Sequence, residues 1–378
     1  PIDPRLLVTV APAVAKAAMD SGVAKYPIKN WDAYENELYK RLGSDDNLLR
    51  YVINKAKQAP KRVIFAEAEN LKILKAAQIV NDEGIATPIL LGKKEKINAL
   101  IEEHGLQLEN IQIIDPKCDS MEDKRYEYGQ KFFEKRQRKG YNLYEAKKVM
   151  RERAYFGSMM LANGEADALI SGITRKYQDM LRPALQIIGM KKEVKRVAGM
   201  YMMLTKKGPI FFADASVNFN PTEDELVDIT VLAAKEVENF NIKPRIAMLS
   251  YSNFGSSDSA EAILVRNAVA KLKATHPELI VDGEMQASVA FNQELMKENY
   301  PFSALVNEAP NVFIFPNLSA GNIAYNLLQE IGGAEAIGPI LLGLNKPVHV
   351  LQLGSTVRQI VNMVAISVVE AQLKSSKK

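Results

Sequence analysis

Residues 62–91, RVIFAEAENLKILKAAQIVNDEGIATPILL, hold the pattern that decides the fold. A β-branched and aromatic run at Arg62–Ala66 predicts a buried strand, and the helical stretch Leu71–Glu83 ends at Gly84. A second apolar run, Pro88–Leu91, predicts the next strand. Because strands that alternate with helices pair in parallel through right-handed crossovers, this stretch predicts an α/β sandwich.

The alternation of strands and helices continues to the carboxyl end. The charged stretch Glu122–Arg153 has helical character throughout, and Pro183 predicts a kink or break in a helix over residues 178–188. Thr222–Glu225 fits the T-x-x-E capping box at the start of a helix. The apolar run Met200–Met203 is suited equally to a core or to an interface.

Composition excludes several classes of protein. The 378 residues are 47% hydrophobic and 25% charged, which is typical of a globular protein with two or three domains. The 49 basic and 45 acidic residues leave a net charge of only +4, so no nucleic-acid partner is expected. No apolar run is long enough to span a bilayer, so no membrane association is expected.

Cysteine and histidine are too sparse for a metal centre. Cys118 is the single cysteine, which excludes an internal disulfide and is consistent with a cytoplasmic protein. The three histidines, His104, His276 and His349, lie far apart and share no metal-ligand spacing, so no metal site is expected. They also form no serine–histidine–acid set for nucleophilic catalysis.

Three loops share one form, in which an apolar strand leads through a Gly/Ser-rich turn into a helix. They are Ser250–Ser259, Pro316–Asn322 and Gly354–Thr356. Free amides at a helix N-terminus can hold a phosphate group, but Gly, Ser and Asn also build tight turns without any ligand. Neither interpretation is excluded, and none of the loops matches a P-loop or a dinucleotide fingerprint.

Two arginines are candidate anion ligands. Arg136 belongs to a basic run, residues 136–140, which could equally be a solvated helix end. Arg182 lies inside the apolar stretch 181–185, where it either extends outward to solvent or holds an anion.

Five ordered motifs resemble the phosphate acetyltransferase (phosphotransacetylase) family. They are GEADALISG (164–172), LRPALQII (181–188), FIFPNLSAGN (313–322), EAIGPI (335–340) and GSTVRQIV (354–361). The N-terminal residues Asp3–Arg5 and Val10–Met19 instead resemble the end of the catalytic region of bacterial NADP-dependent malic enzymes. Those enzymes are fusions that carry a phosphotransacetylase-like region at their carboxyl end, so the chain is expected to be that region.

The resemblance implies two α/β/α domains with a cleft between them, as in the phosphotransacetylase and isocitrate-dehydrogenase-like folds. Residues 1–55 would be the end of the malic enzyme region with linker helices. Residues 56–192 and 340–378 would form domain one, and residues 193–339 domain two. The family's habit of dimerising implies a homodimer or a higher homo-oligomer.

Family members need a base for the CoA thiol and a cation for the phosphate and the developing oxyanion. The resemblance implies that these are an aspartate and an arginine in the last strand-to-helix loop, the arginine within a Ser-Arg-Gly sequence. Here Gln352 stands in place of that serine, Leu353 in place of the arginine, and Gln359 in place of the aspartate. Leucine carries no charge and glutamine is no base near neutral pH, so the resemblance implies that no catalytic residue remains.

Candidate binding residues remain, namely Arg136, Ser171, Arg182, Asn322, Ser355 and Thr356. By resemblance to the malic enzyme fusions, they would bind acetyl-CoA as an inhibitor of malate decarboxylation in a catalytic region joined in cis. NADP and a divalent metal, Mg or Mn, would belong to that catalytic region, and no cofactor is expected in the present chain. Two alternatives stay open, an active acyltransferase that uses other residues and a purely structural dimerisation module.

Overall fold

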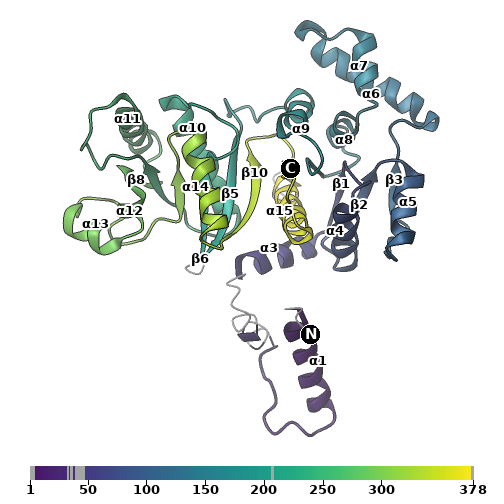
Figure 1. Cartoon of the computed structure of the whole chain (residues 1–378), viewed down its shortest axis with the longest axis horizontal. Helices are drawn as coiled ribbons and strands as arrows, with labels where there is room; N and C mark the ends of the chain where they lie inside the picture. Colours follow the sequence, from purple (N-terminus) through teal and green to yellow (C-terminus); the bar gives the residue numbers. More distant parts are fainter. Residues whose placement is uncertain (1–4, 32–33, 35–36, 39–46, 206–207, 376–378) are drawn as a thin grey trace.

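The computed structural model describes residues 5–31, 34, 37–38, 47–205 and 208–375. These residues form two β-sheets that lie side by side, each flanked by helices (Figure 1). This arrangement confirms the predicted α/β class with two sandwiches. Within residues 1–55, including the Trp31–Lys55 stretch, residues 1–4, 32–33, 35–36 and 39–46 lie outside the described residues.

The first sheet is parallel throughout. Its order is β11 (Val348–Val350), β4 (Ala168–Ser171), β1 (Lys61–Phe65), β2 (Ala86–Leu91) and β3 (Gln112–Ile114). The helices of this half are α3 (Asn47–Gln58), α4 (Leu71–Asp82), α5 (Lys94–Glu103), α6 (Glu122–Arg136), α7 (Leu143–Val149), α8 (Arg153–Ala162), α9 (Tyr177–Pro183) and α15 (Val357–Ser375).

The second sheet is mixed. Its order is β10 (Glu335–Leu342), β5 (Ala198–Thr205), β6 (Gly208–Ala213), β9 (Val312–Ile314), β7 (Arg245–Leu249) and β8 (Ile280–Met285), with antiparallel pairing only between β10, β5 and β6. Its helices are α10 (Glu223–Asn239), α11 (Ala260–Thr275), α12 (Ala287–Ala290), α13 (Gln293–Asn299) and α14 (Leu318–Glu330).

A strand's two faces go to different cores because successive side chains point to opposite sides of a sheet. In β1, Val63 and Phe65 pack with α3, α4 and α15, while Ile64 packs with α6 and α8. In β5, Met200 and Met202 face the same core as α15, whereas Tyr201 and Met203 face the core beneath α14. The run Met200–Met203 is at most 2% exposed, so within this chain it belongs to the core.

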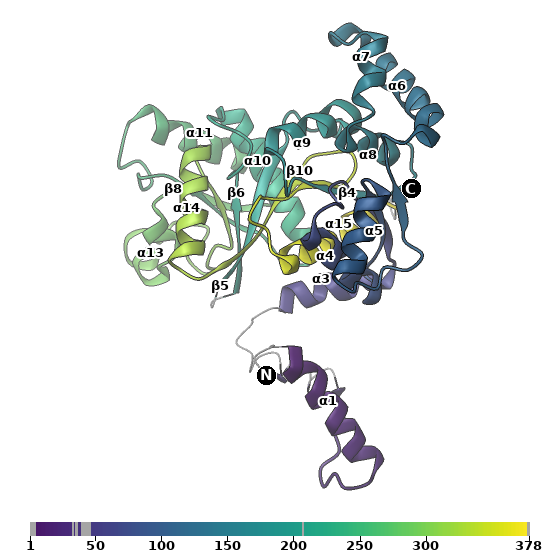
Figure 2. The ribbon, with the colours of Figure 1, turned by 45° about the vertical axis from the view of Figure 1, so that its right-hand side comes forward.

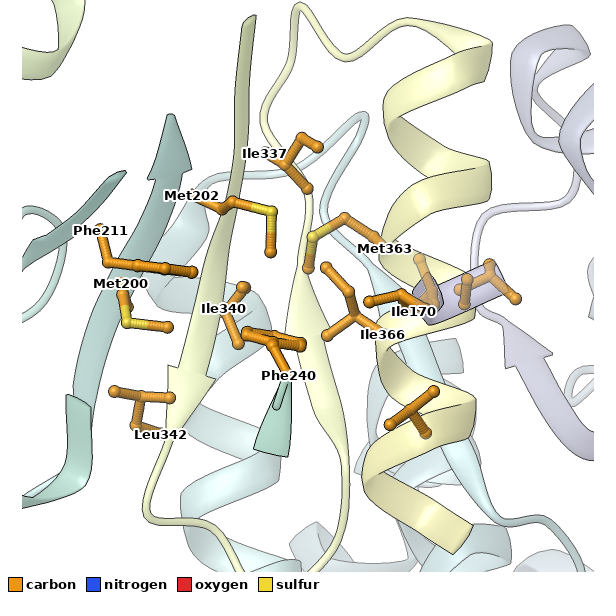
Figure 3. Packing of buried hydrophobic residues seen from close by; sticks show 14 of the residues in the cluster. Ile170, Met200, Met202, Phe211, Phe240, Ile337, Ile340, Leu342, Met363 and Ile366 are labelled. Carbon is orange, nitrogen blue, oxygen red and sulfur yellow. The ribbon is translucent and has the colours of Figure 1, made fainter. Parts of the chain in front are cut away.

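One hydrophobic core is shared by the two sheets. Ile170 of the first sheet and Met202 of the second lie on either side of Met363 and Ile366, which belong to α15 (Figure 3). Ile340 of β10 belongs to the same cluster. Helix α15 is therefore the element through which the two halves pack together.

The sequence of Glu122–Arg153 predicts helical structure throughout, but the structure divides this stretch into separate helices. Helix α6 ends at Arg136, a 3-10 turn follows, and Gly140 turns the chain with a φ of 88°. Asn142 then opens α7 with a capping box, in which Asn142 Oδ1 accepts from the Glu145 backbone amide at 2.8 Å. Figure 2 shows α6 and α7 as an arm that projects from the first sheet.

Other sequence-level expectations are met. The chain around Pro183 passes from α9 into a π-helical turn, Ala184–Ile188, as the predicted break requires. Thr222 Oγ1 accepts from the Glu225 amide at 3.4 Å, and Glu225 Oε2 accepts from the Thr222 amide at 2.9 Å, which confirms the capping box at α10.

The chain passes from the second sheet back to the first between Leu342 and Val348. The predicted resumption of domain one at residue 340 therefore falls inside β10. Helix α1 (Arg5–Asp20) lies apart from both sheets in Figures 1 and 2, with Val10 and Val14 exposed. Among the described residues, the length and apolarity required of a membrane-spanning helix are not met.

Gly172 follows β4 directly and lies against Val350 and Leu351 at the end of β11. Its φ is 106°, and a Cβ there would lie 2.6 Å from Val350 Cγ1 and 2.7 Å from the Leu351 carbonyl oxygen. We expect Gly172→Ala to lower the free energy of unfolding by about 2–4 kcal/mol, because backbone strain and overpacking both contribute. Urea denaturation measures this. Gly164 is the control, since its φ is 79° but nothing lies within 4 Å, and Gly164→Ala should cost only about 1 kcal/mol. Equal losses in the two variants would contradict the close approach.

Candidate functional site

The candidate site lies where β4 and β11 end, next to the second sheet. These strands are parallel neighbours, and the Leu351 amide donates to the Ser171 carbonyl at 2.6 Å just beyond their pairing. The loops that follow, residues 172–176 and 351–356, therefore begin at the same edge of the sheet. In open α/β sheets, this edge is where ligands bind.

A buried carboxylate organises each of three loops near such edges. Glu67 accepts backbone hydrogen bonds from Gly172 at 2.5 Å and Ile173 at 2.7 Å, which sets the turn after β4. Asp214 does the same for residues 216–218 after β6. Glu284 accepts from the Gly255 amide at 2.9 Å and pairs with Arg266 at 3.1 Å. These carboxylates fix the conformation of the loop backbones, and their buried oxygen atoms already accept hydrogen bonds from the chain itself.

Burial sets the ionisation of one of these carboxylates. It raises the pKa of Asp214, against the opposing effect of the backbone amides that donate to it.

Gln352 links the two halves of the molecule. Its Nε2 donates to the hydroxyl of Tyr325 at 2.9 Å and also to the hydroxyl of Tyr201. Tyr201 comes from β5 and Tyr325 from α14, so a side chain of the first half binds two elements of the second. The two rings stack with centroids 4.1 Å apart and an angle of 16° between their planes.

The two tyrosine rings are buried beside the Gln352 side chain. Tyr201 is 2% exposed and Tyr325 is 4% exposed. Burial, followed by the neighbouring Tyr325, raises the pKa of Tyr201, so its hydroxyl stays neutral over the physiological range. The group bonded to Gln352 is thus a neutral acceptor, and no charged side chain takes part in this contact.

Tyr177 reaches the same region from α9. Its hydroxyl lies near Ser216 and Asp214 of the second half, and burial raises its pKa. The Tyr177 and Ser216 hydroxyl oxygens are both buried, and neither makes a hydrogen bond of regular geometry within the described part of the chain. A second tyrosine from this interdomain position therefore also stays uncharged.

Gln359 caps the helix that carries it. Its Oε1 accepts from the Thr356 amide at 2.9 Å, and Thr356 Oγ1 accepts from the Gln359 amide at 3.2 Å, which is a capping box. Its Nε2 donates to the Ala336 carbonyl of β10 at 2.9 Å. Both ends of the amide are used in structural contacts, and the second contact again joins the two halves.

Leu353 and Ser355 complete the turn before α15. Leu353 is 69% exposed and brings no charge to the loop. Ser355 is buried, with its amide donating to the Gln352 carbonyl at 3.1 Å and its Oγ accepting from the Gln352 amide at 3.2 Å. The serine therefore closes the turn on itself.

The predicted binding residues occupy several places. Ser171, Ser355 and Thr356 lie in the two adjoining loops just described. Ser171 Oγ lies 2.8 Å from Met180 Sδ in α9, the helix that carries Arg182. Arg182 is exposed.

Arg182 lies close to Tyr155 in the first half of the molecule, and Tyr155 pairs with Tyr141. Its positive charge acts on Tyr155, whose pKa is nevertheless raised, chiefly by burial. The Tyr155 hydroxyl donates to Gln186 at 2.8 Å and lies 3.2 Å from the Tyr141 hydroxyl. Arg182 and Glu152 thus act on the Tyr155 hydroxyl with opposite sign.

Arg136 and Asn322 lie on separate elements. Arg136 ends α6 on the projecting arm, half-exposed, with a buried Nε that lacks a hydrogen-bond partner in the described structure. Asn322 is exposed on α14, where its Oδ1 accepts from Asn326 at 3.3 Å. No contact recorded for either residue joins it to the loops at Ser171 and Ser355.

The helix N-termini of the three Gly/Ser-rich loops are capped by the chain's own side chains. Ser259 Oγ accepts from the Ala262 amide at 3.3 Å, and Asn317 Oδ1 accepts from the Ala320 amide at 2.9 Å. Thr356 and Gln359 cap α15 in the same way. Of the two interpretations open at the sequence level, these contacts favour tight structural turns.

Sequence reasoning did not identify the tyrosine cluster of Tyr177, Tyr201 and Tyr325. Tyr201 sits in an apolar run that the pattern assigns only to core or interface, and Tyr325 is one of several apolar residues on its helix. The local sequence around Tyr201 and Tyr325 does not indicate that their hydroxyls accept hydrogen bonds from one side chain. That side chain is Gln352, which lies 151 residues from Tyr201 and 27 from Tyr325.

Comparison with known proteins places this geometry in context. Residues 47–368 match the family model described as phosphate acetyl/butaryl transferase. The chain is 38% identical to a phosphate acetyltransferase of Clostridium acetobutylicum over 333 residues, covering 86% of the chain and 99% of that protein. A crystal structure of a phosphotransacetylase from Streptococcus pyogenes superposes with a TM-score of 0.81 at 35% identity, covering 87% of this chain and 99% of that one.

A second group of relatives matches nearly the whole chain. The NADP-dependent malic enzyme of Haemophilus influenzae is 42% identical over 377 residues, which cover 98% of this chain but 49% of that enzyme. The chain thus spans about half the length of the malic enzymes it matches. The match extends over most of residues 1–46, which the family model does not include.

The two roles of Gln359 can be separated by substitution. We expect Gln359→Ala to lower the free energy of unfolding by about 1–2 kcal/mol, since it removes both the cap and the bond to Ala336. Gln359→Glu should cost less, because glutamate keeps the capping-box acceptor and loses only the donor. Chemical denaturation of the two variants measures the difference. If Gln359→Glu were as destabilising as Gln359→Ala, the capping box would contribute nothing.

Proposed function

Since the chain belongs to the phosphate acetyl/butaryl transferase family and matches one half of bacterial malic enzymes, we propose that it is a regulatory and oligomerisation domain of an NADP-dependent malic enzyme. In this proposal it binds acetyl-CoA as an allosteric inhibitor and has lost transacetylase activity. The protein would act in the cytoplasm as a homodimer or larger homo-oligomer. NADP and Mg or Mn would bind in the malic enzyme catalytic region in cis, which would convert malate to pyruvate and CO2.

The observation that carries the proposal is the structural role of the Gln352 and Gln359 side chains. Both amides make hydrogen bonds that hold the fold together, at positions where the resemblance places the groups that perform acyl transfer. Leu353, beside them, is exposed and uncharged. A transferase needs a base for the thiol and positive charge for the oxyanion, and these three side chains supply neither.

Arg182 supports retention of ligand binding. It is exposed, its charge acts on the buried Tyr155, and it lies on α9, whose Met180 contacts Ser171. Exposed guanidinium groups bind phosphate oxygens well because they remain charged and donate in pairs. A CoA ester carries several phosphates, so a site can lose its reaction and keep its anion contacts.

Regulation requires that acetyl-CoA bind two states of the assembly with different affinity. The hydrogen bonds of Gln352 and Gln359 to the second half require the two halves to lie as they do here. A state of the assembly in which the halves lie differently would lack these bonds, and acetyl-CoA could bind the two states with different affinity. Ligand contacts on the loops at the end of β4 and β11 would act directly on this junction.

The first test is ligand-dependent stability. Saturating acetyl-CoA should raise the melting temperature of the chain by a few degrees, and Arg182→Ala should abolish the rise. Arg245→Ala is the control, because Arg245 stands at the opposite, amino-terminal end of β7, and it should respond like the unaltered chain. No rise at millimolar acetyl-CoA would favour a purely structural dimerisation module.

The second test is acyl transfer itself. We expect the chain to form no acetyl phosphate from acetyl-CoA and phosphate, at least about 10²-fold below a phosphate acetyltransferase assayed in parallel, because base and cation are both replaced. Activity that vanished on Arg182→Ala would instead support an active phosphate acetyltransferase that uses other residues.

A further inference from the structure

Helices α6 and α7 form an arm that projects from the first half of the molecule (Figure 2). The two helices pack closely at Gly129, where a Cβ would lie 2.8 Å from Lys147 Cα. Lys147 Nζ also lies 3.6 Å from the centroid of the Tyr126 ring, and this contact again joins α7 to α6. Because the helices are packed against each other in this way, the arm presents its outer side chains in a fixed arrangement.

The arm has an excess of positive charge. Residues 122–149 contain nine basic and five acidic side chains, a net charge of +4, which equals the net charge of all 378 residues. Two of the acidic groups already have partners, since Glu127 pairs with Lys131 at 2.6 Å and Glu145 Oε2 accepts from the Asn142 amide at 3.1 Å. Basic side chains therefore dominate the surface that the arm presents to its surroundings.

Three basic side chains of the arm are exposed and without a counter-charge. Arg138, Lys139 and Lys148 form no ion pair with any residue that the structure describes. Tyr144 is 73% exposed and lies one turn from Lys148 on α7. Like charges at short range repel each other, so an acidic surface placed against these side chains would be stabilising. These four residues are called the arm surface below.

The second half of the molecule has the opposite charge. From β5 to β10, residues 198–342 contain 17 acidic and nine basic side chains, a net charge of −8. On α13, Glu294 and Glu298 are exposed, share one face of the helix, and form no ion pair within the described part of the chain. Lys297 is the single basic residue of this helix. The face of Glu294 and Glu298 therefore carries negative charge that the chain itself does not neutralise.

Two exposed aromatic rings flank α13 in the sequence. Phe291 is 51% exposed and stacks on Phe313 with ring centroids 4.5 Å apart. Phe302 is 68% exposed and lies edge-on to Phe254 with centroids 5.1 Å apart. Each ring is thus held in place by a neighbour while much of it is open to solvent, and aromatic side chains are enriched in protein interfaces. The α13 surface comprises Phe291, Glu294, Glu298 and Phe302.

We propose that the arm surface of one copy of this chain docks on the α13 surface of a second copy. The two surfaces lie at opposite ends of the molecule in both Figures 1 and 2, so they do not meet within one chain. They are opposite in charge, which favours pairing of Arg138 and Lys139 with the α13 carboxylates. A contact between two different surfaces of identical copies is head-to-tail, so it extends an assembly beyond a dimer. The contact rests on the oligomerisation in the proposed function and is independent of acetyl-CoA.

The first test is the molar mass of the full chain, measured by light scattering over a dilution series at about 50 mM NaCl. The unaltered chain should associate beyond a dimer. Arg138→Glu with Lys139→Glu should raise the dissociation constant of that step at least about tenfold, because like charges then face each other. Lys93→Glu with Lys94→Glu is the matched control, since it reverses two adjacent exposed lysines at the start of α5, and it should behave like the unaltered chain.

Two results of this measurement would overturn the proposal. One is an unaltered chain that remains a monomer or a dimer, which would leave the arm to a different partner. The other is an equal dissociation constant for the arm variant and the α5 control. If the charge reversal prevents folding, Arg138→Gln with Lys139→Gln takes its place and should weaken the same step by a smaller factor.

The second test is restoration by reciprocal charge reversal. Glu294→Lys with Glu298→Lys should weaken association about as much as the arm variant does. All four substitutions in one chain should restore association, because an acidic arm then meets a basic α13 surface. A four-fold variant that folds, with a melting temperature within about 2 °C of the unaltered chain, and yet fails to associate would show that the two surfaces do not meet.

Acetyl-CoA is absent from both tests, so the contact and the proposed ligand can fail separately. Loss of association in the arm variant, together with no effect of acetyl-CoA on the melting temperature, would support the contact and contradict acetyl-CoA binding. A rise in melting temperature with acetyl-CoA, together with an unchanged molar mass in the arm variant, would overturn the contact alone.

Discussion

The packing of α15 between the two sheets is the contact on which the remaining structure depends. Met363 and Ile366 of this helix lie between Ile170 of the first sheet and Met202 of the second (Figure 3). Burial of apolar side chains is the largest favourable contribution to folding, and here one cluster provides it for both halves at once. The halves are thereby kept adjacent, and everything at their junction is arranged around this helix.

Polar contacts at the junction occur near both ends of α15. At its beginning, the amides of Gln352 and Gln359 bind the hydroxyl of Tyr325 and the carbonyl of Ala336. Near its end, Glu370 is held by Lys374 and His349. A buried polar group is stable only with partners, so the contacts of Gln352 and Gln359 specify how the second half sits against the first, whereas those of Glu370 lie within the first half. Regulation by a ligand, as proposed, would act through this one helix.

The side chains at these positions have structural roles of their own. Capping boxes accept glutamine as readily as glutamate, so Gln359 can hold the start of α15 without being a base. The Gln352 amide donates to the hydroxyls of both Tyr201 and Tyr325. In this interpretation, replacement of catalytic groups was compatible with stability because the new side chains completed the junction.

Local pattern was sufficient for elements whose signals agree. The unit β1–α4–β2 was predictable because its apolar runs are bounded by Asn70 and Gly84, and the capping box at Thr222 because both partners lie within four residues. β8 and β10 were not predicted. Asp282, Gly283 and Glu284 interrupt the apolar pattern of β8, and Gly338–Pro339 interrupts β10 at its change of register. Their pairing with β7 and β5 overrides the weak local preference.

The sequence by itself therefore determined the α/β class, the family and the uncharged residue types at Leu353 and Gln359, because these are properties of residue type and order. Only the tertiary structure decided that Gln352 meets Tyr201 and Tyr325, and that Gln359 meets Ala336. These contacts join residues 23 to 151 positions apart in the chain. No local propensity encodes them, since they exist only after one shared core has brought the two sheets together.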